Sequence, residues 1–275
     1  MPGGRVDAGR LRLIRTGRRY HGSVPDSRAF VRSVAGSVVS IAVAIVILAV
    51  AVVPFLSPAW VGFEQDRVGA AALTGFSEPD LHRVTNAILG DLVLGSGNFE
   101  VTTDGGPRGS AVLNDREQSH MRDVRGVFRA FGLLAFASLA VLALAAGRTR
   151  GAPNARRRLW RSVRCGAQGL AVGVVIAAGV ALVAFDAAFE VFHRLFFAPG
   201  SFDFDPATDK LVQLFPDAFW SETTIAVGAV VFVAALMVRR AAGRRMVAVP
   251  VPVAVPASPA GRTTGERSAT SGASR

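Results

Sequence analysis

The stretch VAGSVVSIAVAIVILAVAVVPFL at residues 34–56 indicates the fold class of this chain. It contains no charged residue and exceeds the roughly 20 apolar residues that a helix needs to cross a bilayer. Three further apolar stretches follow at about 127–146, 167–191 and 221–238, and 51% of all residues are hydrophobic. The sequence therefore predicts an all-α membrane protein with four transmembrane helices.

Most of the arginines lie on one side of these predicted helices. They crowd the segment before the first helix, the loop between the second and third helices, and the segment after the fourth, whereas the loops 58–126 and 194–219 contain more acids than bases. Short arginine-rich loops stay cytoplasmic. We therefore expect a multi-pass protein of the bacterial cytoplasmic membrane with both termini inside, both acidic loops outside and any active site at the outer face.

The same pattern divides the chain into three parts. Residues 1–29 form a basic cytoplasmic arm, residues 30–240 the membrane domain, and residues 241–275 a disordered tail rich in proline and then in glycine, serine and threonine. In the first outer loop, a capping serine followed by helical spacing predicts an amphipathic helix over about 79–94, and 95–109 is expected to be a flexible turn region. Capping-box spacing from Asn114 to Glu117 predicts a helix that continues into the second membrane span.

The net charge of +11 does not indicate a nucleic-acid partner. The arginines flank membrane helices and belong to no recognisable nucleic-acid module, so anionic lipid headgroups are the expected contacts. The only cysteine, Cys165, excludes an intramolecular disulfide. The sequence does not specify an oligomeric state.

Two histidines are the candidate catalytic residues. On a helix, His120 shares a face with Glu117 and Asp123, and a neighbouring carboxylate can fix an imidazole tautomer and raise its basicity. His193 follows the third membrane helix, whose apolar run ends at Asp186, and the two residues share a face if the helix continues. The alternative for both clusters is an ordinary interfacial helix end with hydrated polar groups and an aromatic belt.

Other chemistry finds little support in the sequence. It contains no G-x-S-x-G elbow, H-E-x-x-H pair, Walker loop or G-x-G-x-x-G turn. A metal site built from both histidines with Glu117 and Asp123 lacks dense ligand spacing. We therefore expect no metal and no cofactor.

Three motifs resemble the lipoprotein intramolecular transacylase (Lit) family of four-helix bacterial membrane proteins: E-x-x-H-M-x-D-V at 117–124, D-x-x-F-x-x-F-H-x-x-F-F at 186–197 and F-P-x-x-F-W at 215–220. The resemblance implies transfer of the sn-2 acyl chain of a diacylglyceryl-modified lipoprotein to the α-amine of its own N-terminal cysteine. His120 and His193 would be the catalytic pair, supported by Glu117, Asp123 and Asp186. The residues expected to bind the acyl chain are Phe192, Phe196, Phe197, Trp220 and Phe202, the last in place of a tryptophan of many relatives.

The implied reaction needs no nucleophile from the enzyme, because the substrate amine attacks the ester itself. We expect His120, oriented by Asp123 or Glu117, to act as the base, and His193 to stabilise the oxyanion or protonate the leaving oxygen; these roles could be exchanged. Two other hypotheses are a non-catalytic membrane protein that binds a partner through its first outer loop, and a membrane metalloenzyme.

Overall fold

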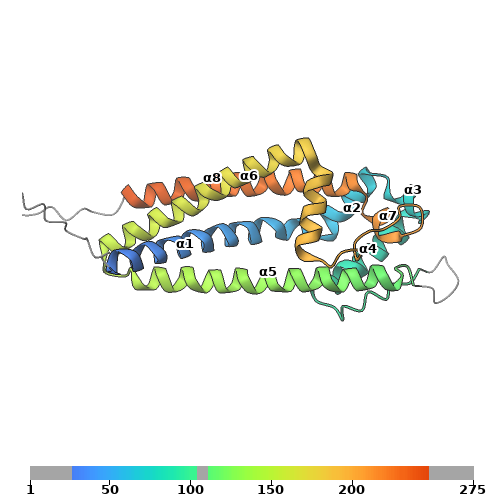
Figure 1. The fold of residues 1–275 in the computed structure, drawn as a ribbon, viewed down its shortest axis with the longest axis horizontal. Helices are drawn as coiled ribbons and strands as arrows, with labels where there is room; N and C mark the ends of the chain where they lie inside the picture. Colours follow the sequence, from blue (N-terminus) through green and yellow to red (C-terminus); the bar gives the residue numbers. More distant parts are fainter. Residues whose placement is uncertain (1–26, 104–110, 248–275) are drawn as a thin grey trace, which may run out of the picture.

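The computed structural model describes residues 27–103 and 111–247, and most of these are helical (Figure 1). Four long helices form the body of the molecule: α1 (Ser27–Val52), α5 (Asp115–Arg148), α6 (Pro153–Phe196) and α8 (Asp217–Val247). Each contains a stretch long and apolar enough to cross a membrane. Apart from one isolated bridge between Thr102 and Ala111, the described residues form no β-structure. The predicted all-α fold with four membrane helices is confirmed.

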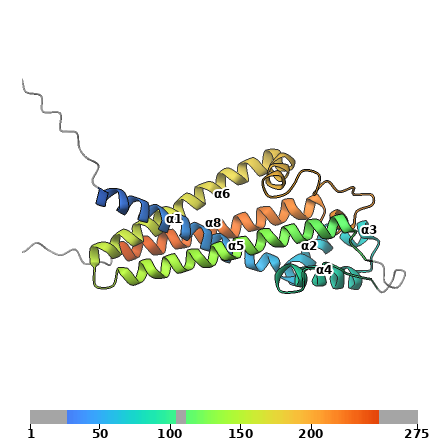
Figure 2. The same ribbon diagram turned by 60° about the horizontal axis from the view of Figure 1, so that its bottom comes forward.

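The four long helices form a bundle in which α6 packs along α8 and α1, while α5 packs along α1 (Figures 1 and 2). Glycine permits the close approach of α1 and α6, because a Cβ atom on Gly166 would collide with the backbone of Ser40. The hydroxyl of Ser40 also donates a hydrogen bond to the carbonyl oxygen of Ser162 at 2.9 Å. The start of α1, the α5–α6 turn and the end of α8 meet at one end, which we call the basic end (Figure 1).

Three of the long helices extend further at the basic end than their apolar stretches predict. α1 begins at Ser27, inside the expected arm, and α8 runs to Val247, so residues 241–247 are helical and not part of a disordered tail. α6 begins at Pro153, which leaves only the turn 149–152 from the expected arginine-rich loop. Arginine is a good helix former and proline suits the first helical position, so these helices continue past the apolar stretch. The rest of the predicted arm and tail lies outside the described residues.

The opposite end carries a small helical unit, which we call the cap and define as residues 53–103, 111–124 and 197–216. Its short elements are a 3₁₀ helix, η1 (Val53–Leu56), and the α-helices α2 (Pro58–Arg67), α3 (Ala70–Thr74), α4 (Glu78–Val93) and α7 (Lys210–Leu214). α4 is the amphipathic helix predicted over 79–94, and the Ser77 hydroxyl caps it by accepting a hydrogen bond from the N–H of Asp80.

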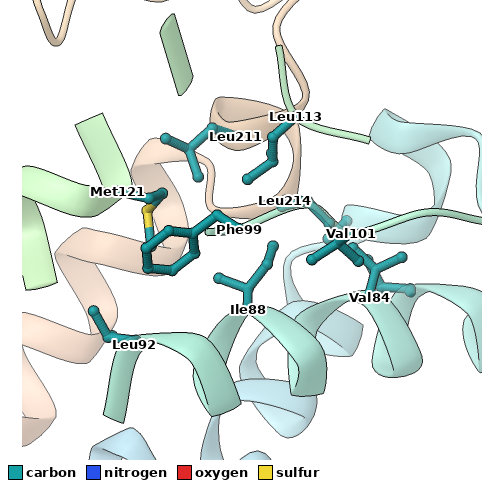
Figure 3. Close-up of a cluster of buried hydrophobic side chains, with 11 residues drawn as sticks. Val84, Ile88, Leu92, Phe99, Val101, Leu113, Met121, Leu211 and Leu214 are labelled. Carbon is teal, nitrogen blue, oxygen red and sulfur yellow. The ribbon is translucent and has the colours of Figure 1, made fainter. Parts of the chain in front are cut away.

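A hydrophobic core holds the cap together (Figure 3). The apolar face of α4 packs against Phe99 and against side chains from α5 and α7, and Figure 3 labels Val84, Ile88, Leu92, Val101, Leu113, Met121, Leu211 and Leu214. Phe99 is fully buried, which corresponds to a stabilisation of roughly 1.5–3 kcal/mol. Residues 95–103 form no helix or strand, as a turn region predicts, but Phe99 and Val101 are fixed in the core, so flexibility is the wrong expectation for these two residues. Residues 104–110 lie outside the described part.

Candidate active site

A bend in α6 positions the second histidine. At Ala184 the backbone leaves helical geometry (φ −149°, ψ 53°), and the following segment, 185–196, turns across the bundle toward α5 (Figure 1). The sequence predicted an uninterrupted third helix, and no proline marks the bend. The bend brings His193 to the start of α5, where His120 lies.

The two histidine rings stack against each other within a group of phenylalanine rings. Their centroids are 6.0 Å apart and their planes are inclined by 21°. His120 is only 6% exposed and is flanked by Phe197, at 4.8 Å between centroids, and Phe204, at 5.4 Å. Phe189 lies 4.0 Å from the His193 ring. The imidazoles therefore face each other in a largely apolar environment at the junction of α5, α6 and the cap.

Hydrogen bonding distinguishes the two imidazoles. Nδ1 of His193 lies 2.8 Å from the carbonyl oxygen of Phe189, and because a carbonyl only accepts, this nitrogen is the protonated one in the neutral ring. Its Nε2 then has the free lone pair. Nδ1 of His120 is buried and has no hydrogen-bond partner among the described residues. Among the described residues, Nε2 of His193 and Nδ1 of His120 are therefore both without a hydrogen-bond partner, and the latter is a buried polar atom.

The three carboxylates expected to support the histidines differ in their positions. Glu117 is buried and accepts hydrogen bonds from the N–H groups of Asn114 (2.7 Å) and Leu211 (2.6 Å). It completes the capping box of α5 and ties α5 to α7, with no hydrogen bond to His120. Asp123 is exposed and near enough to His120 for electrostatic interaction. Asp186 is exposed, and in the described part of the chain no hydrogen bond joins it to either histidine.

A polar network that no sequence motif indicates holds Phe204 beside His120. Asp209, the residue before α7, accepts hydrogen bonds from the side chains of Asn114 (2.9 Å) and Arg116 (2.7 Å). The Arg116 guanidinium also lies 5.0 Å from the centre of the Phe204 ring. The backbone N–H of Asp205 lowers the pKa of Asp209, and together with the Asn114 and Arg116 side chains it outweighs the effect of burial. No spacing in the sequence marks this long-range connection.

The predicted aromatic residues divide into two groups. Phe197 contacts both histidine rings, while Phe192 and Phe202 contact only His193, with centroids 5.4 and 5.2 Å away. Phe196 contacts Phe192 but neither histidine, and Trp220 on α8 contacts Phe189. Phe192, Phe196 and Trp220 are each 40–48% exposed. Phe192, Phe196 and Trp220 therefore extend an aromatic surface from the histidine pair toward the outside of the bundle.

No metal-binding cluster accompanies the pair: within residues 27–103 and 111–247, no three His, Cys, Asp or Glu side chains are grouped so that they could hold an ion. A third histidine, His82, lies apart on α4, where its Nε2 is 2.9 Å from Oδ1 of Asp66 on α2.

The family model described as "Lipoprotein intramolecular transacylase Lit" matches residues 35–220, about two thirds of the chain. The chain belongs to the Lit family. Solved structures of membrane-integral Lit from Bacillus cereus share the fold: one has a TM-score of 0.63 at 17% identity and covers 80% of this chain and 97% of its own. Another, with a histidine replaced by arginine, has a TM-score of 0.64 at 15% identity and covers 80% and 93%. No curated protein matches.

Proposed function

We propose that this Lit-family protein transfers the sn-2 acyl chain of a diacylglyceryl-modified lipoprotein to the α-amine of the same molecule's N-terminal cysteine, with His120 and His193 as the acid–base pair. The observation that supports this best is the pair itself. Two imidazoles from distant parts of the sequence stack with their ring centroids 6.0 Å apart. Nε2 of His193 and Nδ1 of His120 have no hydrogen-bond partner among the described residues. Family membership supplies the reaction class.

The reaction needs acid–base help more than it needs a nucleophile. The amine nitrogen attacks the ester carbonyl carbon, the new C–N bond forms, and the ester C–O bond breaks. The amine loses a proton and the leaving glyceryl oxygen gains one, so the exchange is balanced without a co-reactant. Holding amine and ester together supplies the orientation, and positioned imidazoles relay the proton.

The hydrogen bonds favour one assignment of roles. Because Nδ1–H of His193 donates a hydrogen bond to the carbonyl oxygen of Phe189, Nε2 keeps its lone pair as a proton acceptor, and we assign His193 as the base. His120 would then stabilise the oxyanion or return a proton to the leaving oxygen. This assignment exchanges the two roles expected from the sequence. Asp123 is then the carboxylate that interacts electrostatically with His120.

The exposed aromatic surface is the proposed path of the acyl chain. Phe192, Phe196 and Trp220, together with the 73% exposed Leu195, present apolar side chains beside the histidines. In a bilayer these side chains would meet lipid, so a diacylglyceryl group could reach the pair without leaving an apolar environment.

The proposed reaction also requires the cap on the outside of the cytoplasmic membrane, where the lipoprotein amine is found. The arginines support this orientation, because they gather at the basic end and would keep it, with both termini, in the cytoplasm.

Mass spectrometry of lipoprotein N-termini tests the proposal. A bacterial host without its own N-acylating enzymes would express this chain or an empty vector. We expect N-acylated cysteine with a lyso-glyceryl group only with the chain. Diacylglyceryl cysteine with a free amine in both strains, despite folded protein in the membrane, would refute the proposed function.

A further inference from the structure

The basic end of the bundle contains a groove between the start of α6 and the end of α8. The groove has a volume of about 420 Å³, and its lining includes Arg157, Arg161 and Arg164 of α6 and Gly243 and Met246 of α8. The three arginines follow one another at spacings of four and three, so they share a face of α6. The two helices lie side by side here, at the end opposite to the histidine pair (Figures 1 and 2).

The positive charge of this groove has no counter-charge nearby in the described part of the chain. Residues 27–56, 124–185 and 223–247 contain no aspartate or glutamate. A fourth arginine, Arg239 on α8, donates a hydrogen bond from Nε to Oε1 of Gln168, which also lines the groove. Several guanidinium groups around one groove repel each other, so an anion from outside the chain would stabilise the arrangement.

The groove lies at the depth of lipid headgroups. The apolar stretch of α6 begins near Ala167, and at 1.5 Å per residue Arg164 and Arg161 lie about 5 and about 9 Å beyond it along the helix. The headgroup layer occupies the few ångströms outside the hydrocarbon core. Guanidinium groups bind phosphate through paired hydrogen bonds, and basic pockets between membrane helices bind anionic headgroups.

We propose that this groove is a binding site for the phosphate headgroup of an anionic phospholipid, separate from the site of acyl transfer. The lipid is a ligand here and not a substrate, because the groove and the histidine pair are at opposite ends of the bundle. The proposal therefore stands independently of the proposed function.

Native mass spectrometry of the intact, detergent-purified chain provides the first test. The chain is offered phosphatidylglycerol and phosphatidylcholine at equal concentration, with and without millimolar inorganic phosphate. We expect phosphatidylglycerol to be retained at least about tenfold more than phosphatidylcholine, and phosphate not to displace it. Equal retention of the two lipids, or displacement by phosphate, would overturn the proposal; displacement would indicate a site for free anions.

A pair of triple variants locates the site. R157Q/R161Q/R164Q removes the groove arginines, and R156Q/R158Q/R240Q removes the same charge from exposed positions at the same end that do not line the groove. Glutamine has a helix propensity close to that of arginine. We expect only the groove variant to lose at least about tenfold in phosphatidylglycerol retention, at an unchanged unfolding temperature. An equal loss in both variants would show a diffuse charge effect and overturn the proposal. If the triple variant unfolds, R161Q alone replaces it, with an expected loss of about 3- to 10-fold in phosphatidylglycerol retention.

Discussion

At the scale of single residues, the site depends on groups whose partners are far away in the sequence. The motifs identified His120 and His193, and in the structure their rings stack against each other. The motif could not reveal the function of Glu117, whose carboxylate is occupied by backbone N–H groups of Asn114 and Leu211. Local spacing places Glu117 and His120 on the same face of a helix, but the fold as a whole determines which group the carboxylate meets.

Gly97 provides a residue-scale test of the cap. It has φ +79°, and a Cβ atom there would collide with the guanidinium of the buried Arg125. We expect Gly97→Ala to destabilise the cap by about 1–3 kcal/mol, because the left-handed conformation is strained for alanine and the Arg125 guanidinium would also have to move. Thermal unfolding in detergent measures the change. Gly126→Ala, in a helical position with open space, is the matched control, and equal unfolding temperatures for the two variants would contradict this description of the loop.

At the scale of elements, the sequence predicted what local chemistry determines. The capping residue Asn114 and the amphipathic spacing of α4 each indicated a helix that the structure contains. The bend at Ala184 was not predictable in this way, because neither proline nor glycine occupies it and an apolar run looks the same whether straight or bent. The predicted helices are too short at the basic end, because hydropathy marks only the apolar part of a helix and not the polar turns that continue it.

The bend leads to an element-scale prediction. One alanine inserted after Ala184 rotates the segment 185–196 by about 100° and turns His193 away from His120. We expect transacylation to fall by at least about 10²-fold, the lower range for loss of a general acid or base. The lipoprotein mass-spectrometric assay measures the loss. An insertion between Arg150 and Gly151, in the turn at the basic end, should leave activity intact; normal activity in the Ala184 insertion would show that the bend does not position the pair.

The Asp209 network predicts a pH dependence of cap stability. The folded-state pKa of Asp209 is lowered below the ordinary value of an aspartate, so its carboxylate stabilises the cap above about pH 4, and this contribution is lost as the pH falls through the folded-state pKa. We expect the chain to unfold at a higher temperature than Asp209→Asn near neutral pH. The difference between the two unfolding temperatures should narrow as the pH falls from about 5 toward about 2. A constant difference over this range would contradict the assignment.

At the scale of the whole molecule, hydropathy predicts the four membrane helices and the arginine distribution predicts on which side their ends lie. The sequence predicted that both ends of the chain lie on one side of four helices, and the described ends of α1 and α8 do meet at the basic end (Figure 1). The cap was only partly predictable. Its core joins α4, α5 and α7 across long stretches of sequence, and no periodicity within one segment specifies such contacts.

Orientation in the membrane is a prediction at this scale. In a Cys165→Ser background, a single cysteine at Glu78 in the cap should react with a membrane-impermeant maleimide on intact cells, because we propose that the cap faces outward. A single cysteine at Arg150 in the α5–α6 turn should react only after the cells are permeabilised. Both positions are exposed in the structure, so accessibility within the protein is matched. The reverse labelling pattern would place the cap in the cytoplasm.

The most direct measurement compares three histidine variants on one purified diacylglyceryl lipoprotein, with mass spectrometry of its N-terminal peptide. His120→Ala and His193→Ala should each lose about 10²- to 10⁴-fold in the rate of acyl transfer. His82→Ala should retain activity, because His82 pairs with Asp66 away from the stacked rings. Full activity in a well-folded His120→Ala or His193→Ala variant would contradict the claim that this pair catalyses the transfer.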